Sequence, residues 1–187
     1  MAEGSDERFK QLMGRRALSV EVVIDDTTLR DGIQMPGTAV SPKDAAQVAR
    51  LLDSIGVERI EVHQYHKPDR EAIQLIKAMG LRAKLAVWCR AAKGDVENAV
   101  SLDIEEVGIS HPVSQAHIQA KWPEKGFEEI LGNIVDVVEF ARAHGLTIFV
   151  HGEDSTRADW EMEKAIVNGV AAAGAKVYRI CDTVGVG

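Results

Sequence analysis

Six apolar, β-branched runs alternate with segments of helical periodicity along this chain, and each run ends in polar or ionisable residues. The runs cover residues 21–26, 59–62, 83–88, 105–109, 146–151 and 176–181. Strands that alternate with helices predict βαβ crossovers and a parallel sheet. A doubly wound sheet and a TIM barrel both satisfy this pattern. No Gly-x-Gly-x-x-Gly sequence follows any of the runs, which weakens a dinucleotide-binding interpretation.

Capping residues mark the helices between these runs. Ser41 and Pro42 predict the start of the first helix, and Gly56 predicts its end. Further helices are predicted after Pro68 and over residues 95–102, 127–144 and 156–174. The segment between the fourth run and the helix at 127–144 is predicted to be a long loop that contains His111, a candidate for substrate contact.

Composition narrows the class of protein. The 187 residues suffice for one domain with a core, and 45% hydrophobic with 27% charged residues is typical of a globular protein. A net charge of −7 argues against a nucleic-acid partner, because phosphate binding requires a basic face. No apolar run is long enough to span a membrane, and no signal peptide is visible. Two cysteines without an export signal favour free thiols in a cytoplasmic protein.

The number of strands limits the architecture. We predict an N-terminal extension at residues 1–19, loose or with a short helix, and a folded domain at residues 20–187. A complete eight-fold barrel runs to about 250 residues, whereas six strands and five helices are predicted here. The sheet is therefore open, or it is a barrel truncated after strand six. A truncated barrel would expose the pairing edges of its first and sixth strands.

Arg30 and Asp31 directly follow the first strand. An aspartate at this position can bind a hard divalent cation, and the adjacent arginine can stabilise an oxyanion. A local salt bridge, or a turn around Gly32, explains the same two residues equally well from chemistry alone.

His151 and Glu153 end the fifth strand, and residues two apart on a strand point the same way. The pair suits a base, a ligand or an oriented hydrogen-bond pair. Alternatively, Glu153 and Asp154 only lead into the positive end of the next helix, and His151 is a satisfied, half-buried histidine. Of the two carboxylates, Glu153 is the better candidate for function and Asp154 for capping.

Other strand ends carry weaker signals. Glu61 and His63 alternate on the second strand and could face the same opening. Arg90 follows an apolar strand and requires a partner, such as Glu61 or a substrate carboxylate. Asp182 and Thr183 could hold a carboxylate or carbonyl group, or could simply form a helix N-cap.

Three motifs, in this order, resemble those of the metal-dependent TIM-barrel condensing and lyase enzymes. They are Asp26-Thr27-Thr28-Leu29-Arg30-Asp31-Gly32-x-Gln34 after the first strand, Glu153-Asp154-Ser155-x-Arg157 after the fifth, and Asp182-Thr183-x-Gly185 after the sixth. The similarity covers about residues 20–187. The family includes 2-isopropylmalate synthase, homocitrate synthase, citramalate synthase and hydroxymethylglutaryl-CoA lyase. The resemblance implies an α/β fold, a TIM (β/α)8 barrel, here truncated after strand six.

The resemblance also implies roles for the matching residues. Asp31 is expected to bind a divalent metal (Mg²⁺, Mn²⁺ or Zn²⁺), and Arg30 is expected to stabilise the enolate or alkoxide. Glu153 is expected to lie close to a 2-oxo acid substrate, and Thr183 is expected to bind its carboxylate. The residues expected to line the substrate pocket are Gln34, His63, Arg90 and His151.

The sequence departs from the family at three points. Ile33 follows the glycine of the first motif, where the family often has Glu or Asn. The second strand ends in Glu61-Val62-His63 in place of the usual Glu-x-Gly, which puts a bulky, titratable side chain at the mouth. The family's His-x-His metal pair lies on strand seven, so this sequence carries one of three expected protein ligands.

The implied reaction is a Claisen-type condensation of acetyl-CoA with a 2-oxo acid, by a cytoplasmic enzyme whose relatives are commonly homodimers. A metal chelated by the 2-oxo acid would polarise its ketone, and Arg30 would meet the developing negative charge. Two alternatives stay open. One is a lyase or aldolase of the same fold, which runs the carbon–carbon step backwards. The other is a non-catalytic fragment or subunit whose exposed barrel edges pair with another chain.

Overall fold

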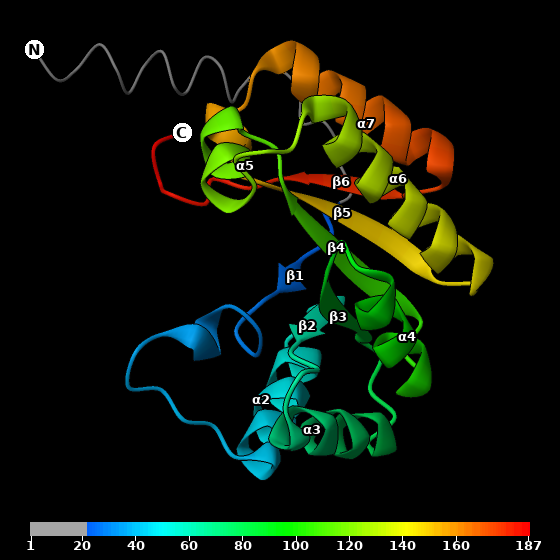
Figure 1. Cartoon of the computed structure of the whole chain (residues 1–187). Coiled ribbons are helices and arrows are strands. Elements are labelled where there is room, and N and C mark those ends of the chain that lie inside the picture. The colour runs from blue at the N-terminus through cyan, green and yellow to red at the C-terminus, as the bar shows by residue number, and fades with distance from the viewer. Residues whose placement is uncertain (1–21) are drawn as a thin grey trace, which may run out of the picture.

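The computed structural model describes residues 22–187 as one curved parallel sheet with helices on its outer side (Figure 1). The strands lie side by side in sequence order: β1 (Asp25–Asp26), β2 (Arg59–Val62), β3 (Lys84–Arg90), β4 (Glu106–Pro112), β5 (Thr147–Glu153) and β6 (Val177–Ile180). This order is that of a barrel, because a doubly wound sheet reverses its strand order at a switch point. The predicted barrel, truncated after strand six, is confirmed, and the doubly wound alternative is wrong.

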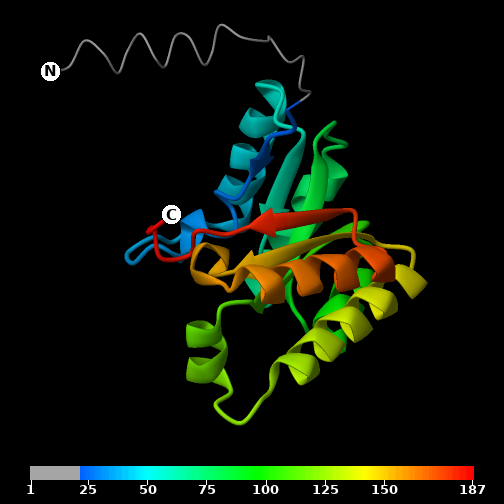
Figure 2. The ribbon, with the colours of Figure 1, turned by 90° about the horizontal axis from the view of Figure 1, so that it is seen from above.

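Helices connect successive strands. They are α2 (Pro42–Ser54), α3 (Lys67–Ala78), α4 (Lys93–Ser101), α5 (Gln115–Lys121), α6 (Phe127–Ala143) and α7 (Trp160–Ala173), with short 3-10 turns η1 (Gly32–Gln34) and η2 (Ser155–Arg157). Figure 2 shows α6 and α7 packed beside each other next to β5 and β6. The predicted start of the first helix is confirmed, because Ser41 Oγ accepts the backbone N–H of Asp44. Gly174 ends α7 with a positive φ of 119°, which glycine adopts without strain.

The centre of the sheet is its best-buried part. All seven residues of β4 are buried, and β4 pairs with β3 on one side and β5 on the other. Ile109 of β4, Ile134 of α6 and Ile166 of α7 have no exposed surface. These apolar contacts form a rigid base on which the ends of β3, β4 and β5 are held.

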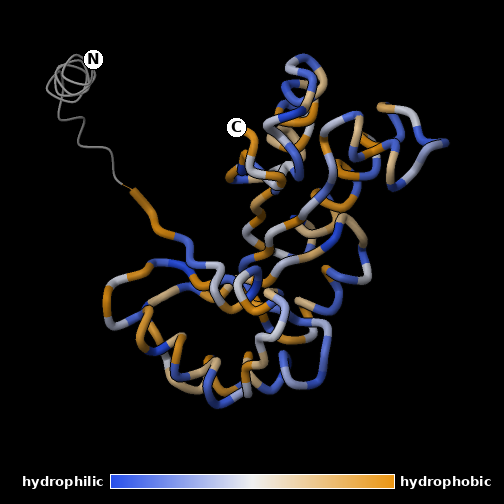
Figure 3. The backbone as a smooth tube through the Cα atoms, turned by 90° about the vertical axis from the view of Figure 1, so that its left-hand side faces the viewer, coloured by the Kyte–Doolittle hydropathy of each residue, from blue (hydrophilic) through white to orange (hydrophobic). Residues whose placement is uncertain are grey.

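The two edges of the sheet are different. β1 is shorter than the predicted strand at 21–26, because only Asp25 and Asp26 pair with β2. The preceding apolar residues, Val22 to Ile24, form the apolar start of the described chain and are more than half exposed (Figure 3). Ile24 O still accepts the backbone N–H of Arg59 in β2. At the opposite edge, Ile180 of β6 is 72% exposed. Within residues 22–187 no strand pairs with the outer edge of β1 or of β6, as predicted for strands one and six.

The segment after strand four differs from its prediction. β4 continues to Pro112, so His111 lies inside a strand and is only 3% exposed. The predicted long loop contains the helix α5, which Ser114 caps by accepting the backbone N–H of His117. The predicted N-terminal extension, residues 1–19, lies outside the described residues. Within residues 22–187, no helix has the length and apolar character needed to cross a bilayer.

Candidate functional site

A cavity of about 540 Å³ opens where the carboxyl ends of the strands meet, the end at which barrel enzymes carry their active sites. It brings together six of the eight side chains to which the family resemblance assigns a role: Arg30, Asp31, Gln34, His151, Glu153 and Thr183. Glu61, Trp88, Ser110, Arg179, Cys181 and Asp182 also line it. Residues from six strand ends, up to about 150 positions apart in sequence, therefore share one cavity.

Arg30 is held from two sides. Its Cζ lies 4.6 Å from the centre of the Trp88 ring, a cation–π arrangement, and its Nη1 donates to Asp31 Oδ1 at 2.7 Å. Its Nε is buried without a hydrogen-bond partner among the described residues, although Glu61 Oε1 lies 3.7 Å away. The local salt bridge with Asp31 therefore exists, and it uses only one N–H of a guanidinium that lines the cavity.

Ionisable side chains from three further strands meet beside Glu61 at the inner end of the cavity. Arg179 Nη1 lies 2.9 Å from His151 Nε2 and 3.2 Å from Glu61 Oε2, while its Nη2 pairs with Asp25. Burial raises the pKa of Glu61 to about 7, against the opposing effect of the Arg30 charge. Burial lowers the pKa of His151 to about 4, so its imidazole is neutral at neutral pH.

Glu153 is bonded on both oxygens. Oε1 accepts from Ser110 Oγ at 2.7 Å, and Oε2 accepts from Lys121 Nζ at 2.9 Å. Burial alone would raise the pKa of Glu153, but the hydrogen bonds from Lys121 and Ser110 hold it below its ordinary value. Glu153 is thus a fixed negative charge at neutral pH, on the side of the cavity formed by β4 and β5.

Asp154 and Thr183 connect the fifth and sixth strand ends. The backbone N–H of Asp154 donates to Thr183 Oγ1 at 2.9 Å, which fixes the hydroxyl beside the cavity. Asp154 stands at the N-cap position of η2, but its buried carboxylate bonds Arg157 and Ser114 and makes no capping hydrogen bond, so the predicted capping role of this side chain is wrong. Asp159 caps the following helix instead.

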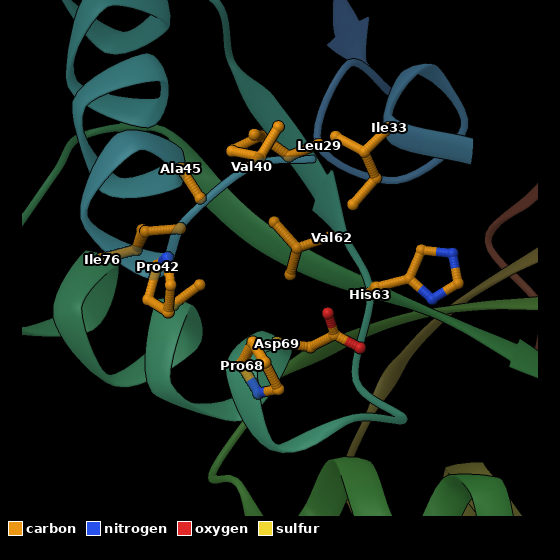
Figure 4. A pocket seen from close by; sticks show the side chains of 11 residues that line it. Leu29, Ile33, Val40, Pro42, Ala45, Val62, His63, Pro68, Asp69 and Ile76 are labelled. Carbon is orange, nitrogen blue, oxygen red and sulfur yellow. The ribbon is translucent and has the colours of Figure 1, made fainter. Parts of the chain in front are cut away.

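His63 does not line this cavity. It lies at a smaller pocket lined mainly by aliphatic side chains from the segment after β1 and from α2 and α3 (Figure 4). Its Nε2 is buried without a hydrogen-bond partner in the described part of the chain, and burial lowers its pKa. Glu61 and His63 therefore do not face one opening together, and the role of His63 in substrate binding stays a prediction.

Arg90 and His111 also lie away from the cavity lining. The guanidinium of Arg90 forms two hydrogen bonds to the Asp95 carboxylate, at 2.9 and 2.8 Å, and the side chain is 66% exposed. Asp95 is thus the partner that the sequence required, and the expected partner Glu61 is wrong. His111 is buried against Trp122, with ring centres 5.0 Å apart. The substrate-binding role of Arg90 stays a prediction that this pairing does not support.

Sequence reasoning missed three residues of the cavity, Trp88, Ser110 and Arg179, and also Lys121, the partner of Glu153. Arg179 had a readable signal, because a charged residue inside an apolar strand requires a buried partner. Ser110 directly follows the predicted end of the fourth strand, so the strand-end rule could have found it. Lys121 had no such signal, because its helix lies in a segment predicted to be a loop.

The resemblance implies a divalent metal, and the described residues do not provide a complete site for one. Asp31 is a suitable oxygen ligand, and its side chain is 69% exposed at the cavity. No group of three His, Cys, Asp or Glu side chains within residues 22–187 is arranged to hold a metal ion. These residues therefore supply one carboxylate and no closed coordination shell.

The strand order and the cavity at the carboxyl ends of the strands place the chain in the class of TIM-barrel proteins, and sequence comparison gives the family. The HMGL-like family model matches residues 21–187, so the chain belongs to the HMGL-like family. The chain is 38% identical over 167 residues to the (R)-citramalate synthase CimA of Methanocaldococcus jannaschii, and the aligned region covers 88% of this chain and 34% of that protein. It is 38% identical over 168 residues to homocitrate synthase 1 of Nostoc sp., with 89% and 44% covered. The chain spans between a third and a half of these relatives.

Solved structures share the fold. The hydroxymethylglutaryl-CoA lyase of Pseudomonas aeruginosa matches with a TM-score of 0.74 at 20% identity, over 89% of this chain and 59% of that one. The lyase of Acinetobacter baumannii in complex with coenzyme A and 3-methylmalate matches with a TM-score of 0.68 at 15% identity, over 87% and 57%. The six-stranded part of a barrel described above is therefore the fold of the corresponding part of these lyases.

Proposed function

We propose that this chain is part of an acyl-CoA-dependent enzyme that condenses acetyl-CoA with a 2-oxo acid. The observation that carries the proposal is that Arg30, Asp31, Glu153 and Thr183, from three separate motifs, line one cavity. The synthase relatives named above support condensation over other reactions. The proposed catalytic domain comprises residues 20–187 as a partial barrel.

The side chains suggest a division of roles. Thr183 and Gln34 would bind the 2-oxo acid, with the fixed charge of Glu153 beside it. The methyl group of acetyl-CoA loses a proton, and the resulting carbanion forms a bond to the ketone carbon of the 2-oxo acid. The ketone oxygen gains the electron pair, and the guanidinium of Arg30 stabilises that charge before the oxygen is protonated. Hydrolysis of the thioester then releases coenzyme A.

The other parts of the proposal follow the family resemblance. Acetyl-CoA is the proposed co-substrate, and Asp31 is the proposed protein ligand of a divalent metal. A homodimer in the cytoplasm is proposed, without nucleic-acid or membrane partners. The two cysteines are free thiols, which fits a reducing compartment.

Two further functions each have an observation in their favour. A lyase that breaks the carbon–carbon bond is favoured by the shared fold of the solved lyases. A non-catalytic half barrel that pairs with another chain is favoured by the exposed edge at Val22 to Ile24. The lyase would use the same carbonyl chemistry in the cavity, whereas the pairing function requires no chemistry there.

The test is an assay of the full chain with acetyl-CoA, Mn²⁺ and a panel of pyruvate, 2-oxoisovalerate, 2-oxoglutarate and oxaloacetate. Release of free coenzyme A with formation of a 2-hydroxy di- or tricarboxylic acid, lost in Arg30→Met, is the expected result. Cleavage of 3-hydroxy-3-methylglutaryl-CoA without any condensation would establish the lyase. Absence of both reactions would contradict catalysis by this chain and favour the pairing function.

A further inference from the structure

Arg179 reaches from β6 across the inside of the barrel to three other strands. Its Nη2 pairs with Asp25 of β1, and its Nη1 lies 3.2 Å from Glu61 Oε2 of β2 and 2.9 Å from His151 Nε2 of β5. The guanidinium carbon lies 5.0 Å from the centre of the Phe149 ring. These contacts hold the guanidinium at the inner end of the cavity in one orientation.

The contact with Arg179 determines which nitrogen of His151 carries the proton. A guanidinium donates hydrogen bonds and accepts none, so His151 Nε2 is the acceptor in this contact. In a neutral imidazole the proton then resides on Nδ1. Nδ1 has no hydrogen-bond partner among residues 22–187, and His151 lines the cavity. Its N–H is therefore available to a ligand.

Glu61 is the alternative partner for the same nitrogen. Its Oε2 lies 3.6 Å from His151 Nε2, close enough to accept a hydrogen bond from a protonated Nε2 after a small movement. A histidine whose Nε2–H is held by a carboxylate has an unprotonated Nδ1, which is the arrangement of a general base. Arg179 prevents this pairing, because its Nη1 donates to both Glu61 and His151.

Gly108 of β4 leaves room for this arrangement. A Cβ at position 108 would lie 2.7 Å from Cε1 and Nε2 of His151 and 3.0 Å from Glu61 Oε2. Such distances force neighbouring atoms to move, so any side chain at this position would displace the imidazole from Arg179. The close approach of β4 and the His151 ring thus depends on glycine.

We propose that Arg179 is a positioning residue that holds His151 as the neutral Nδ1–H tautomer. His151 then donates a hydrogen bond through Nδ1 to a carbonyl or carboxylate oxygen in the cavity. It is unavailable as a base, because Nδ1 carries the proton and Nε2 accepts from Arg179. The identity of that oxygen, as part of a 2-oxo acid, rests on the proposed function. The tautomer itself does not.

The test reads the tautomer directly. Long-range ¹H–¹⁵N NMR correlations of the full chain, labelled with ¹⁵N-histidine, separate protonated from unprotonated ring nitrogens, and His151→Gln assigns the signal. The native chain is expected to show a protonated Nδ1 and an unprotonated Nε2 at neutral pH. Arg179→Met is expected to move the proton to Nε2, at least in part, because Glu61 becomes the partner.

The matched control is Arg59→Met. Arg59 also lies over the Phe149 ring, at 4.1 Å, and 3.9 Å from Asp25, so the variant removes a similar interior cation. Arg59 has no hydrogen bond to His151 within the described chain, and the native tautomer is expected to persist. A loss of the Nδ1–H form in both variants would show a general structural effect and would overturn the proposal.

Two other results would also overturn it: a protonated Nε2 in the native chain, or an unchanged tautomer in Arg179→Met. If Arg179→Met does not fold, Gly108→Ala decides, because its methyl group displaces the ring while Arg179 stays. Loss of the Nδ1–H form in Gly108→Ala supports the proposal, and its retention contradicts it. The predicted tautomer in a chain that makes no product with any 2-oxo acid would contradict the proposed function alone.

Discussion

The cavity has two sides, each with one carboxylate that is largely shielded from solvent, and the two environments shift the carboxylate pKa values in opposite directions. On the β5 side, short hydrogen bonds from Lys121 and Ser110 hold the pKa of Glu153 below its ordinary value despite burial. On the β2 side, Glu61 is 2% exposed, Arg179 donates to it at 3.2 Å and Arg30 lies 3.7 Å away, and burial still raises its pKa to about 7. Short, well-aligned donors therefore outweigh desolvation at one carboxylate, and desolvation dominates at the other.

This difference suggests different work for the two sides. Glu153 keeps its charge at neutral pH and can orient a ligand without exchanging a proton. Glu61 can gain or lose a proton near neutral pH, next to the guanidinium proposed to stabilise the developing charge. The β2 side is therefore the side on which substitutions are expected to change chemistry, and the β5 side the one on which they change binding and stability.

The largest effect is expected from Arg30→Met on the β2 side. Loss of a donor aimed at a developing negative charge typically lowers kcat by about 10²–10³-fold. Steady-state kinetics of condensation measure this loss. The control is Arg82→Met, which removes a guanidinium that is 78% exposed and lies near Asp53, outside the cavity. A loss below about tenfold would place the charge stabilisation elsewhere.

Glu61→Gln is expected to change how stability depends on pH. Between the ordinary value of 4.5 and the folded value of about 7, the folded chain keeps a proton that the unfolded chain has released. The stabilisation is therefore complete below the ordinary value, and it is lost as pH rises through the folded value. A shift of this size contributes about 3 kcal/mol to the free energy of unfolding.

Urea unfolding from about pH 5 to about pH 8 measures this contribution. The variant cannot ionise at this position, so it is expected to lack the part of the pH dependence that comes from Glu61. The difference between the native chain and Glu61→Gln isolates Glu61, because other titrating groups such as His151 remain in both. Equal pH dependence in the two proteins would show that Glu61 is ionised throughout, and the contrast between the two carboxylates would disappear.

Ser110→Ala tests the β5 side at the level of one hydrogen bond. Removing a donor to an ionised carboxylate is expected to lower the free energy of unfolding by about 1–2 kcal/mol at neutral pH. The pKa of Glu153 is expected to rise, because one of its two close donors is gone. Carboxyl ¹³C NMR gives that pKa, and an unchanged value would assign the low pKa to Lys121 alone.

The smallest effect is expected from Lys121→Met. Lys121 is 43% exposed, so its pair with Glu153 is screened and is worth about 0.2–1 kcal/mol. The stability gained from the low pKa of Glu153 is present above its ordinary value of 4.5 and lost as pH falls through the folded value. The variant is expected to show a smaller loss in acid unfolding. Lys125→Met, which breaks a surface pair with Glu129, is the control and is expected to leave this acid dependence unchanged.

Much of the fold was predictable because its signals are local. Ser41 and Gly174 mark helix ends through capping and positive φ, and both positions match the structure. The strand-end rule placed Arg30 and Glu153 at the cavity mouth. The helix α5 was missed, because a seven-residue helix gives only a weak signal in a segment with the character of a loop. The end of the strand containing His111 was also missed, because the strand continues past its apolar run.

The sequence by itself determined the alternation of strands and helices, the parallel sheet and the end of the sheet at which polar residues gather. Periodicity and capping act within a few residues, so these features are legible in the chain. The tertiary structure decided which ionisable groups meet: Arg90 with Asp95, and Arg179 with Asp25, Glu61 and His151. Glu61 and Arg179 are 118 residues apart, and only the curvature of the sheet, a sum of twists over all its strands, brings them together.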